Sequence, residues 1–176
     1  MGKRLFRQEA LSALAVLAAG ALLHFVYQWS GSSPVAGAFS AVNESVWEHM
    51  KLVFTPLFLL TMGQVFFLGR TWPNFLAARS VSVLLGTLLV PVLYYTYSGA
   101  AGIHVLWADI LVFALSVLAV FLLESRLLHR GSMEAGWSQA AGLLALWALA
   151  FLFVFWTYRP PHIPLFQDPL TLRYGL

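Results

Sequence analysis

The chain has no cysteine and few charged residues, and both absences limit what it can be. Without cysteine there is no disulfide, no thiolate metal site and no thiol nucleophile. Charged residues make up 10% of the 176 residues, whereas soluble domains carry about 25%. No run of basic residues exceeds two, so the net charge of +3 does not indicate a nucleic-acid partner. The sequence therefore excludes thiol chemistry and is not typical of a water-soluble domain.

Hydrophobic residues, in contrast, make up 60% of the chain, and the mean hydropathy is +0.80. They fall into five apolar stretches, at 11–29, 50–68, 75–97, 105–123 and 137–158. A hydrocarbon core of about 30 Å is crossed by about 20 residues of α-helix. We therefore predict an all-α, polytopic transmembrane helix bundle with five spans. Residues 1–176 form one membrane domain, in contact with the lipid bilayer, in a multi-pass protein of the cell membrane.

The orientation follows from the basic residues between the stretches. The N-terminus and the loops near Arg70 and Arg130 are basic, whereas residues 30–43 and 98–102 hold no basic residue. Basic loops stay in the cytoplasm, so we predict the N-terminus inside and the C-terminus outside. The first stretch is long for a signal peptide and lacks a good cleavage site, so we expect it to be a mature span. Glu124, at the end of the fourth span beside Arg126, is expected to form an interfacial pair.

An unusual polar segment opens the second span. On a helix, Glu44, Glu48 and Lys51 share one stripe, and carboxylates four residues apart repel each other. Lys51, a bound cation or a proton would offset that repulsion. Two interpretations stay open. Ser45 and Glu48 fit a capping box that only begins the helix. Alternatively, at least one of Glu44, Glu48 and His49 has a functional role.

Further polar residues interrupt the apolar stretches on the predicted outer side. His24 and Asp109 lie within spans, where ionisable residues are functional candidates by default. Buried Asp109 needs a partner such as Lys51, a histidine or a tyrosine. His104 lies about 140° from Asp109 on a straight helix, so we do not expect the two to bind one ion. Tyrosines at the end of the third span fit either a site or an interfacial aromatic belt.

The C-terminal segment 159–176 is rich in proline and cannot be a helix. It also carries large apolar residues, which a disordered tail would not need. We predict that it docks over the extracytoplasmic end of the bundle and brings His162 and Asp168 there. The alternative is a covering segment that does no chemistry.

These residues make up the predicted site. The candidate catalytic residues are Glu44, Glu48 and Asp109. The candidate ligand-binding residues are His24, Asn43, Lys51, Tyr94, Tyr97 and His104. The candidate metal ligands are His49, His162 and Asp168. Imidazoles and carboxylates without cysteine suit a divalent metal such as zinc, although the sequence holds no HExxH motif.

Two segments carry a resemblance to a known family. They are 39–51 (FSAVNESVWEHMK) and 161–171 (PHIPLFQDPLT), the second followed by Tyr174 and Gly175. They resemble an uncharacterised family of small polytopic bacterial membrane proteins, classed as a domain of unknown function. The resemblance covers the whole chain and implies a multi-span bundle with no established activity. Leu172 and Arg173 stand where the family pattern implies a glycine and a small polar residue, so we expect the last turn to differ.

Three functions remain open from the sequence. The first is a ligand- or partner-binding membrane protein, which would contact another protein or a second copy of itself. The second is a metal-dependent hydrolase or transferase that acts at the outer leaflet. The third is a small proton- or cation-coupled transporter, for which the cytoplasmic half offers few matching groups.

Overall fold

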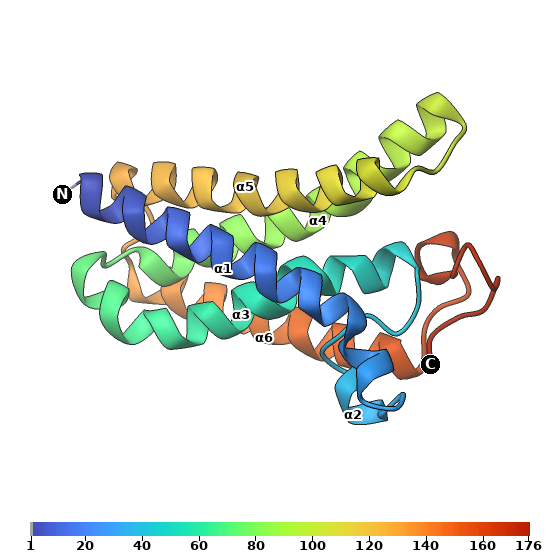
Figure 1. Cartoon of the computed structure of the whole chain (residues 1–176). Coiled ribbons are helices and arrows are strands. Elements are labelled where there is room, and N and C mark those ends of the chain that lie inside the picture. The colour runs from blue at the N-terminus through green and yellow to red at the C-terminus, as the bar shows by residue number, and fades with distance from the viewer. Residues whose placement is uncertain (1) are drawn as a thin grey trace.

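The computed structural model describes residues 2–176, with side chains from Leu5 onward. In chain order its helices are α1 (Gly2–Trp29), α2 (Pro34–Gly37), α3 (Val46–Thr71), α4 (Phe75–Ala101), α5 (Leu106–Arg130), α6 (Gly136–Tyr158) and the short 3₁₀ helix η1 (Pro164–Phe166). Figure 1 shows the long helices side by side in one bundle. Within residues 2–176 the only β-type pairing is an isolated bridge between Gln167 and Tyr174.

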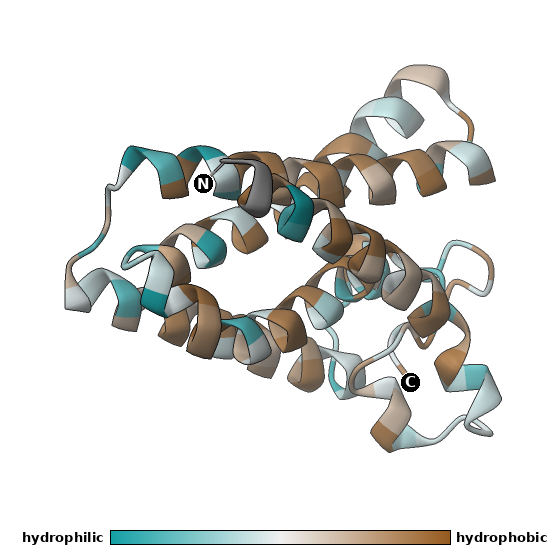
Figure 2. Cartoon of the chain, turned by 60° about the vertical axis from the view of Figure 1, so that its left-hand side comes forward, coloured by the Kyte–Doolittle hydropathy of each residue, from teal (hydrophilic) through white to brown (hydrophobic). Residues whose placement is uncertain are grey.

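The all-α prediction with five spans is confirmed for these residues. Helices α1, α3, α4, α5 and α6 are each long and apolar enough to cross a membrane. Each extends past its apolar stretch at one end or both, because polar residues continue the helix into the interface. Large apolar side chains face outward, such as Phe67 at 74% exposed and Leu144 at 69%. Figure 2 shows apolar residues along the middle of the helices and polar residues nearer their ends, as expected for a multi-pass membrane protein.

Helix α4 lies at the centre of the bundle. It packs against α3, α5 and α6, while α1 covers α3 and α5. Small residues allow these close approaches. A Cβ atom on Gly86 of α4 would lie 2.2 Å from the Val120 side chain of α5, and one on Gly142 of α6 would lie 2.9 Å from Ser80 Oγ. Glycine at these two positions therefore sets the spacing of α4 from its neighbours.

The loops divide between the two ends of the bundle. One end carries the start of α1 and the connections 72–74 and 131–135, and we call it the N-terminal end (Figure 1). The other carries residues 30–45, the α4–α5 connection and residues 159–176, and we call it the tail end. Most of the residues expected to form the site lie at the tail end.

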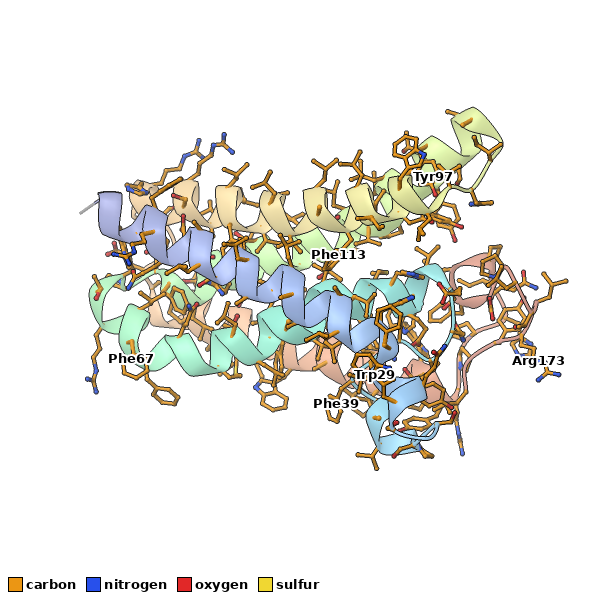
Figure 3. The ribbon with its side chains drawn as sticks, in the orientation of Figure 1. Trp29, Phe39, Phe67, Tyr97, Phe113 and Arg173 are labelled. Atoms are coloured by element: carbon orange, nitrogen blue, oxygen red, sulfur yellow. The ribbon has the colours of Figure 1, made fainter. Side chains whose placement is uncertain are left out.

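The C-terminal segment 159–176 packs onto the bundle. Phe166 is buried, with its ring 4.7 Å from that of Trp47 on α3 and 5.4 Å from that of Trp156 on α6. Asn43 donates a hydrogen bond from Nδ2 to the carbonyl of Gly175 at 3.0 Å. Figure 3 shows Arg173 of this segment at the same end of the molecule as Tyr97 of α4. The segment therefore covers the start of α3.

The last turn carries an unfavourable backbone conformation. Leu172 has φ +59°, and it stands where the family resemblance implies a glycine. The left-handed conformation costs a non-glycine residue about 1–2 kcal/mol. Glycine avoids this cost, but it loses more conformational freedom on folding, which reduces the gain by about 0.5–1 kcal/mol. We therefore expect Leu172→Gly to raise the free energy of unfolding by up to about 1 kcal/mol, measured by thermal unfolding in detergent.

Leu170→Gly is the matched control. Leu170 is also an exposed leucine of the same turn, but its φ is not positive. Glycine there relieves no strain, so we expect a small loss of stability. Equal effects of the two substitutions would contradict a strained Leu172.

Candidate functional site

Helix α3 begins with a cap at Ser45. The Ser45 hydroxyl accepts a hydrogen bond from the Glu48 backbone N–H at 3.4 Å, and Asn43 Oδ1 accepts one from the Ser45 N–H at 2.9 Å. Helix N-termini favour such side-chain acceptors because their first N–H groups have no helical partner. Glu44 therefore lies before the helix, and the expected stripe of Glu44 and Glu48 does not form. The two carboxylates point to different neighbours.

Glu48 belongs to a buried network with Lys51. Both side chains are almost completely buried, and Lys51 Nζ lies 2.5 Å from Glu48 Oε2. The ammonium also donates to the Gly37 carbonyl at 2.9 Å and to Thr157 Oγ1 at 2.8 Å. Glu48 accepts from the Val42 N–H at 3.0 Å as well. These contacts join α2, the loop before α3, α3 itself and α6, which leaves neither charged group free for a ligand.

A second cluster joins the loop before α3 to α1. Glu44 Oε1 lies 3.6 Å from His24 Nε2, and Glu44 Oε2 lies 3.4 Å from His49 Nε2. One ligand atom from each residue lies within 4.8 Å of the others. The His49 ring is fixed from its other side, because Nδ1 lies 2.9 Å from the Ser45 carbonyl. We call His24, Glu44 and His49 the histidine–glutamate cluster.

This cluster borders a cavity of about 280 Å³ at the tail end. Glu44 and His49 line one part of it, and the other lining residues are Val46, Leu52, Val90, Tyr94, His104, Asp109, Val112, Phe113, Pro169 and Leu170. The cavity therefore lies between α3, α4, α5 and the C-terminal segment. Figure 3 shows Phe113 on the inner side of α5. We call this cavity the tail-end pocket.

The ends of α4 and α5 bring further polar groups to the pocket. The Tyr97 hydroxyl donates a hydrogen bond to Asp109 Oδ1. Tyr94 Oη lies 3.1 Å from His104 Nδ1, and the two rings are stacked. A neighbouring hollow of about 450 Å³ also borders Tyr94 and His104. Asp109 thus has a tyrosine as partner and not Lys51, which is held by Glu48.

The C-terminal segment brings His162 and Asp168 to the tail end, but outside the histidine–glutamate cluster. The His162 ring packs 4.6 Å from that of Tyr174. Asp168 accepts hydrogen bonds from the Leu170 N–H at 2.9 Å and the Thr171 hydroxyl at 2.7 Å, so it holds its own turn. Of the three candidate metal ligands, only His49 joins the group of described residues that can hold an ion. Pro169 and Leu170 contribute to the pocket wall instead.

The sequence did not indicate His24 as a partner of His49, or Arg79 as a buried residue. His24 lies near the end of the first span, and only the tertiary fold places it beside residues 44–49. Arg79 lies on α4, buried, with Nε 2.7 Å from Glu124 Oε2. The expected interfacial pair of Glu124 with Arg126 is therefore wrong, because Glu124 faces the interior and Arg126 is exposed. The only sequence signal for this pair was a single arginine within an apolar stretch.

Comparison with known proteins is consistent with this description. No curated protein matches the chain, and no solved structure matches it. A family of unknown function, DUF6512, matches residues 7–176. Because the match covers nearly the whole chain, the resemblance is confirmed, and the protein belongs to the DUF6512 family of unknown function.

Proposed function

We propose that this membrane protein binds a divalent metal ion of the zinc type at His24, Glu44 and His49 and presents it to a small ligand in the tail-end pocket. The observation that carries the proposal is the convergence of two imidazoles and one carboxylate within 4.8 Å, from segments far apart in the chain. Two histidines and a glutamate, with a fourth position left open, are a known set of ligands for catalytic zinc.

The cluster has nearly the size that a tetrahedral ion requires. Zinc binds imidazole nitrogen and carboxylate oxygen at about 2.0–2.2 Å, which places neighbouring ligand atoms about 3.3–3.5 Å apart. The two nitrogen–oxygen distances at Glu44 are 3.4 and 3.6 Å, each to a different carboxylate oxygen, and one ligand atom from each of the three residues lies within 4.8 Å of the others. The side chains would therefore have to close in by about 1 Å to surround an ion.

The orientation of His49 also supports a metal site. A carbonyl oxygen can only accept, so His49 Nδ1 carries the hydrogen of its contact with Ser45. In the neutral ring this leaves a lone pair on Nε2, the nitrogen that faces Glu44. Metal-binding histidines commonly donate their second N–H to a backbone carbonyl or carboxylate in this way.

The pocket indicates what kind of ligand would meet the ion. Its wall is mostly apolar, from residues such as Leu52, Val112 and Phe113, and its polar groups are few. This combination is typical of small-molecule sites. A ligand with one polar group near Glu44 and His49 and an apolar part against α4 and α5 fits it best.

A metal-dependent hydrolase or transferase is the second candidate, and Asp109 favours it. Asp109 lines the same pocket as His49 and Glu44, and one of its oxygens is held by Tyr97. A bound zinc ion would activate a water molecule. Asp109 would be the spare carboxylate that accepts the proton, while Glu48 is unavailable because it pairs with buried Lys51.

The proposed orientation places this site on the extracytoplasmic side. What supports it is the distribution of basic residues, since Arg7, Arg70, Arg126 and Arg130 belong to the segments of the N-terminal end. Basic residues are retained on the cytoplasmic side. Arg159 and Arg173 are the exceptions, at the tail end.

Metal analysis of the purified full-length protein tests the proposal. We expect one zinc ion per chain after equilibration with zinc and removal of the excess. His49→Ala and His24→Ala should weaken binding at least about 100-fold, because losing even an outer partner of a metal ligand costs about 10–100-fold.

His162→Ala is the matched control, since His162 is also a histidine of the tail end but packs on Tyr174. It should keep the zinc, as should Asp109→Asn. The proposal fails if the wild-type protein binds no zinc, or if His162→Ala loses the ion as readily as His49→Ala. In that case Glu44 and its two histidines are an ion-paired interfacial group only.

A further inference from the structure

A separate buried cluster of charged residues lies nearer the N-terminal end, away from the pocket. It consists of Glu9 on α1, Gln64 on α3, Arg79 on α4 and Glu124 on α5. Arg79 and Glu124 are each 1% exposed, and Glu9 is 9% exposed. Charged residues inside a membrane bundle are costly and are retained mainly where they have a role. We call this group the arginine cluster.

Arg79 organises the cluster. Its Nε lies 2.7 Å from Glu124 Oε2, and its Nη2 donates to Gln64 Oε1 at 3.0 Å. The guanidinium also lies 5.1 Å from the centre of the Phe75 ring and 5.4 Å from that of Phe121. Gln64 in turn donates to the Ser12 hydroxyl of α1 at 3.0 Å. Helices α3, α4 and α5 thus meet at one guanidinium, and Gln64 links α1 to them.

Four buried polar atoms of the cluster have no hydrogen-bond partner among the described residues. Arg79 Nε and Glu124 Oε2 are satisfied by each other as an ion pair, whereas Glu9 Oε1 and Arg79 Nη1 have no such contact. A buried polar atom without a partner costs about 1–3 kcal/mol, and more when it is charged. A neutral carboxyl group on Glu9 would carry less of this cost than a carboxylate, because burying a charge costs more than burying a neutral polar group.

The charges of the cluster do not balance. The cluster holds two carboxylates, Glu9 and Glu124, but only one guanidinium, which pairs with Glu124, so the fully ionised group carries one excess negative charge. Among the described side chains, α3 contributes neutral Gln64 to this cluster, whereas its buried ion pair of Glu48 and Lys51 lies at the tail end. Helix α6 has no acidic or basic residue. His129 of α5 and the arginines of this end, Arg7, Arg70, Arg126 and Arg130, are exposed to the surroundings.

We propose that the arginine cluster is a proton-binding site, in which Glu9 carries an exchangeable proton while Glu124 stays paired with Arg79. One proton on Glu9 brings the net charge of the buried group to zero and converts its unpaired carboxylate into a neutral carboxyl group. Burial disfavours the ionised form of a carboxyl group that has no cation of its own.

A proton fits the site better than a metal cation. Hard cations require about six or more oxygen ligands. Here Gln64 Oε1 and Glu124 Oε2 already face Arg79, which leaves Glu9 with too few companions. The site is independent of the metal proposal, because it lies on other residues nearer the other end of the bundle.

Infrared spectroscopy of the full-length protein in lipid nanodiscs tests the proposal. At neutral pH we expect the C=O band of a protonated carboxyl group, shifted on exchange into D₂O. Glu9→Gln should abolish this band. Glu124→Gln should abolish it too, because one carboxylate then remains for one guanidinium. Glu134→Gln is the control, since Glu134 is an exposed glutamate of the same end and should leave the band unchanged.

Several results would overturn the proposal. A wild-type spectrum without the band does so by itself, whatever the variants show. Persistence of the band in Glu9→Gln places the proton elsewhere. Loss of the band when sodium is added at constant pH would make the group a cation site instead.

Discussion

Replacing Lys51 by methionine is expected to lower the free energy of unfolding by about 3–5 kcal/mol, the usual cost of breaking a buried ion pair from one side. The Lys51 ammonium makes three contacts, to Glu48, Gly37 and Thr157, and the side chain is 0% exposed. Methionine fills a similar volume but leaves Glu48 buried without its cation. Chemical unfolding in detergent, followed by tryptophan fluorescence, measures the loss.

Two further variants show whether the ion pair causes the loss. Arg173→Met removes an exposed cation of the same end and should change stability by less than about 0.5 kcal/mol. The double variant Glu48→Gln with Lys51→Met removes both charges and should recover a large part of the stability. If Lys51→Met alone unfolds as the wild type does, the network does not hold the tail end together.

This network shows what a sequence pattern cannot decide. Glu48 and Lys51 in a polar segment were equally compatible with a site and with structure. The choice depends on Thr157 and Gly37, which lie far from Lys51 in sequence and next to it in space. The capping of α3 by Ser45, in contrast, is local and could be read from the spacing of Ser45 and Glu48.

The five spans could be predicted because their signal is also local. Each requires only enough consecutive apolar residues to cross the hydrocarbon core. The apolar pattern does not show which face of each helix turns inward, because apolar side chains can face either lipid or a neighbouring helix. Arg79 illustrates this, because its position in an apolar stretch does not show which way it faces, and the fold buries it against Glu124.

The sequence could predict that histidines and carboxylates gather at the tail end, but not which of them contact one another. The polar residues His24, Glu44 and His49 were recognisable one by one, because histidine and glutamate are unusual at these depths. Their meeting depends on how residues 30–45 return the chain from α1 to α3. Likewise, the proline-rich segment was expected at this end, but His162 packs against Tyr174, so its imidazole lies outside the cluster.

The docking of the C-terminal segment depends chiefly on one aromatic residue, Trp47. Its side chain is 5% exposed, and its ring lies 4.5 Å from that of Phe153, 4.7 Å from Phe166 and 5.1 Å from Trp156. Trp47→Ala should lower the free energy of unfolding by about 3–5 kcal/mol, as truncation of a buried tryptophan commonly does. The loss should be concentrated at the tail end, because Phe166 then loses its aromatic partner on α3.

Hydrogen exchange measured by mass spectrometry locates the effect. In the wild type, the backbone N–H groups of Asp168, Leu172 and Leu176 are hydrogen-bonded and should exchange slowly. In Trp47→Ala we expect faster exchange across residues 159–176 and unchanged exchange in α5. Trp107→Ala is the matched control, because Trp107 is 69% exposed and should leave the segment protected.

The same variant links the segment to the pocket. Pro169 and Leu170 form part of the pocket wall beside Glu44 and His49, so release of residues 159–176 opens that wall. His24 belongs to α1, Glu44 to the loop before α3 and His49 to α3, and their contacts with one another do not involve the segment. Trp47→Ala should therefore retain zinc but lose affinity for any ligand held by the pocket. Equal protection of residues 159–176 in Trp47→Ala and wild type would show that other contacts, such as Asn43 with Gly175, hold the segment in place.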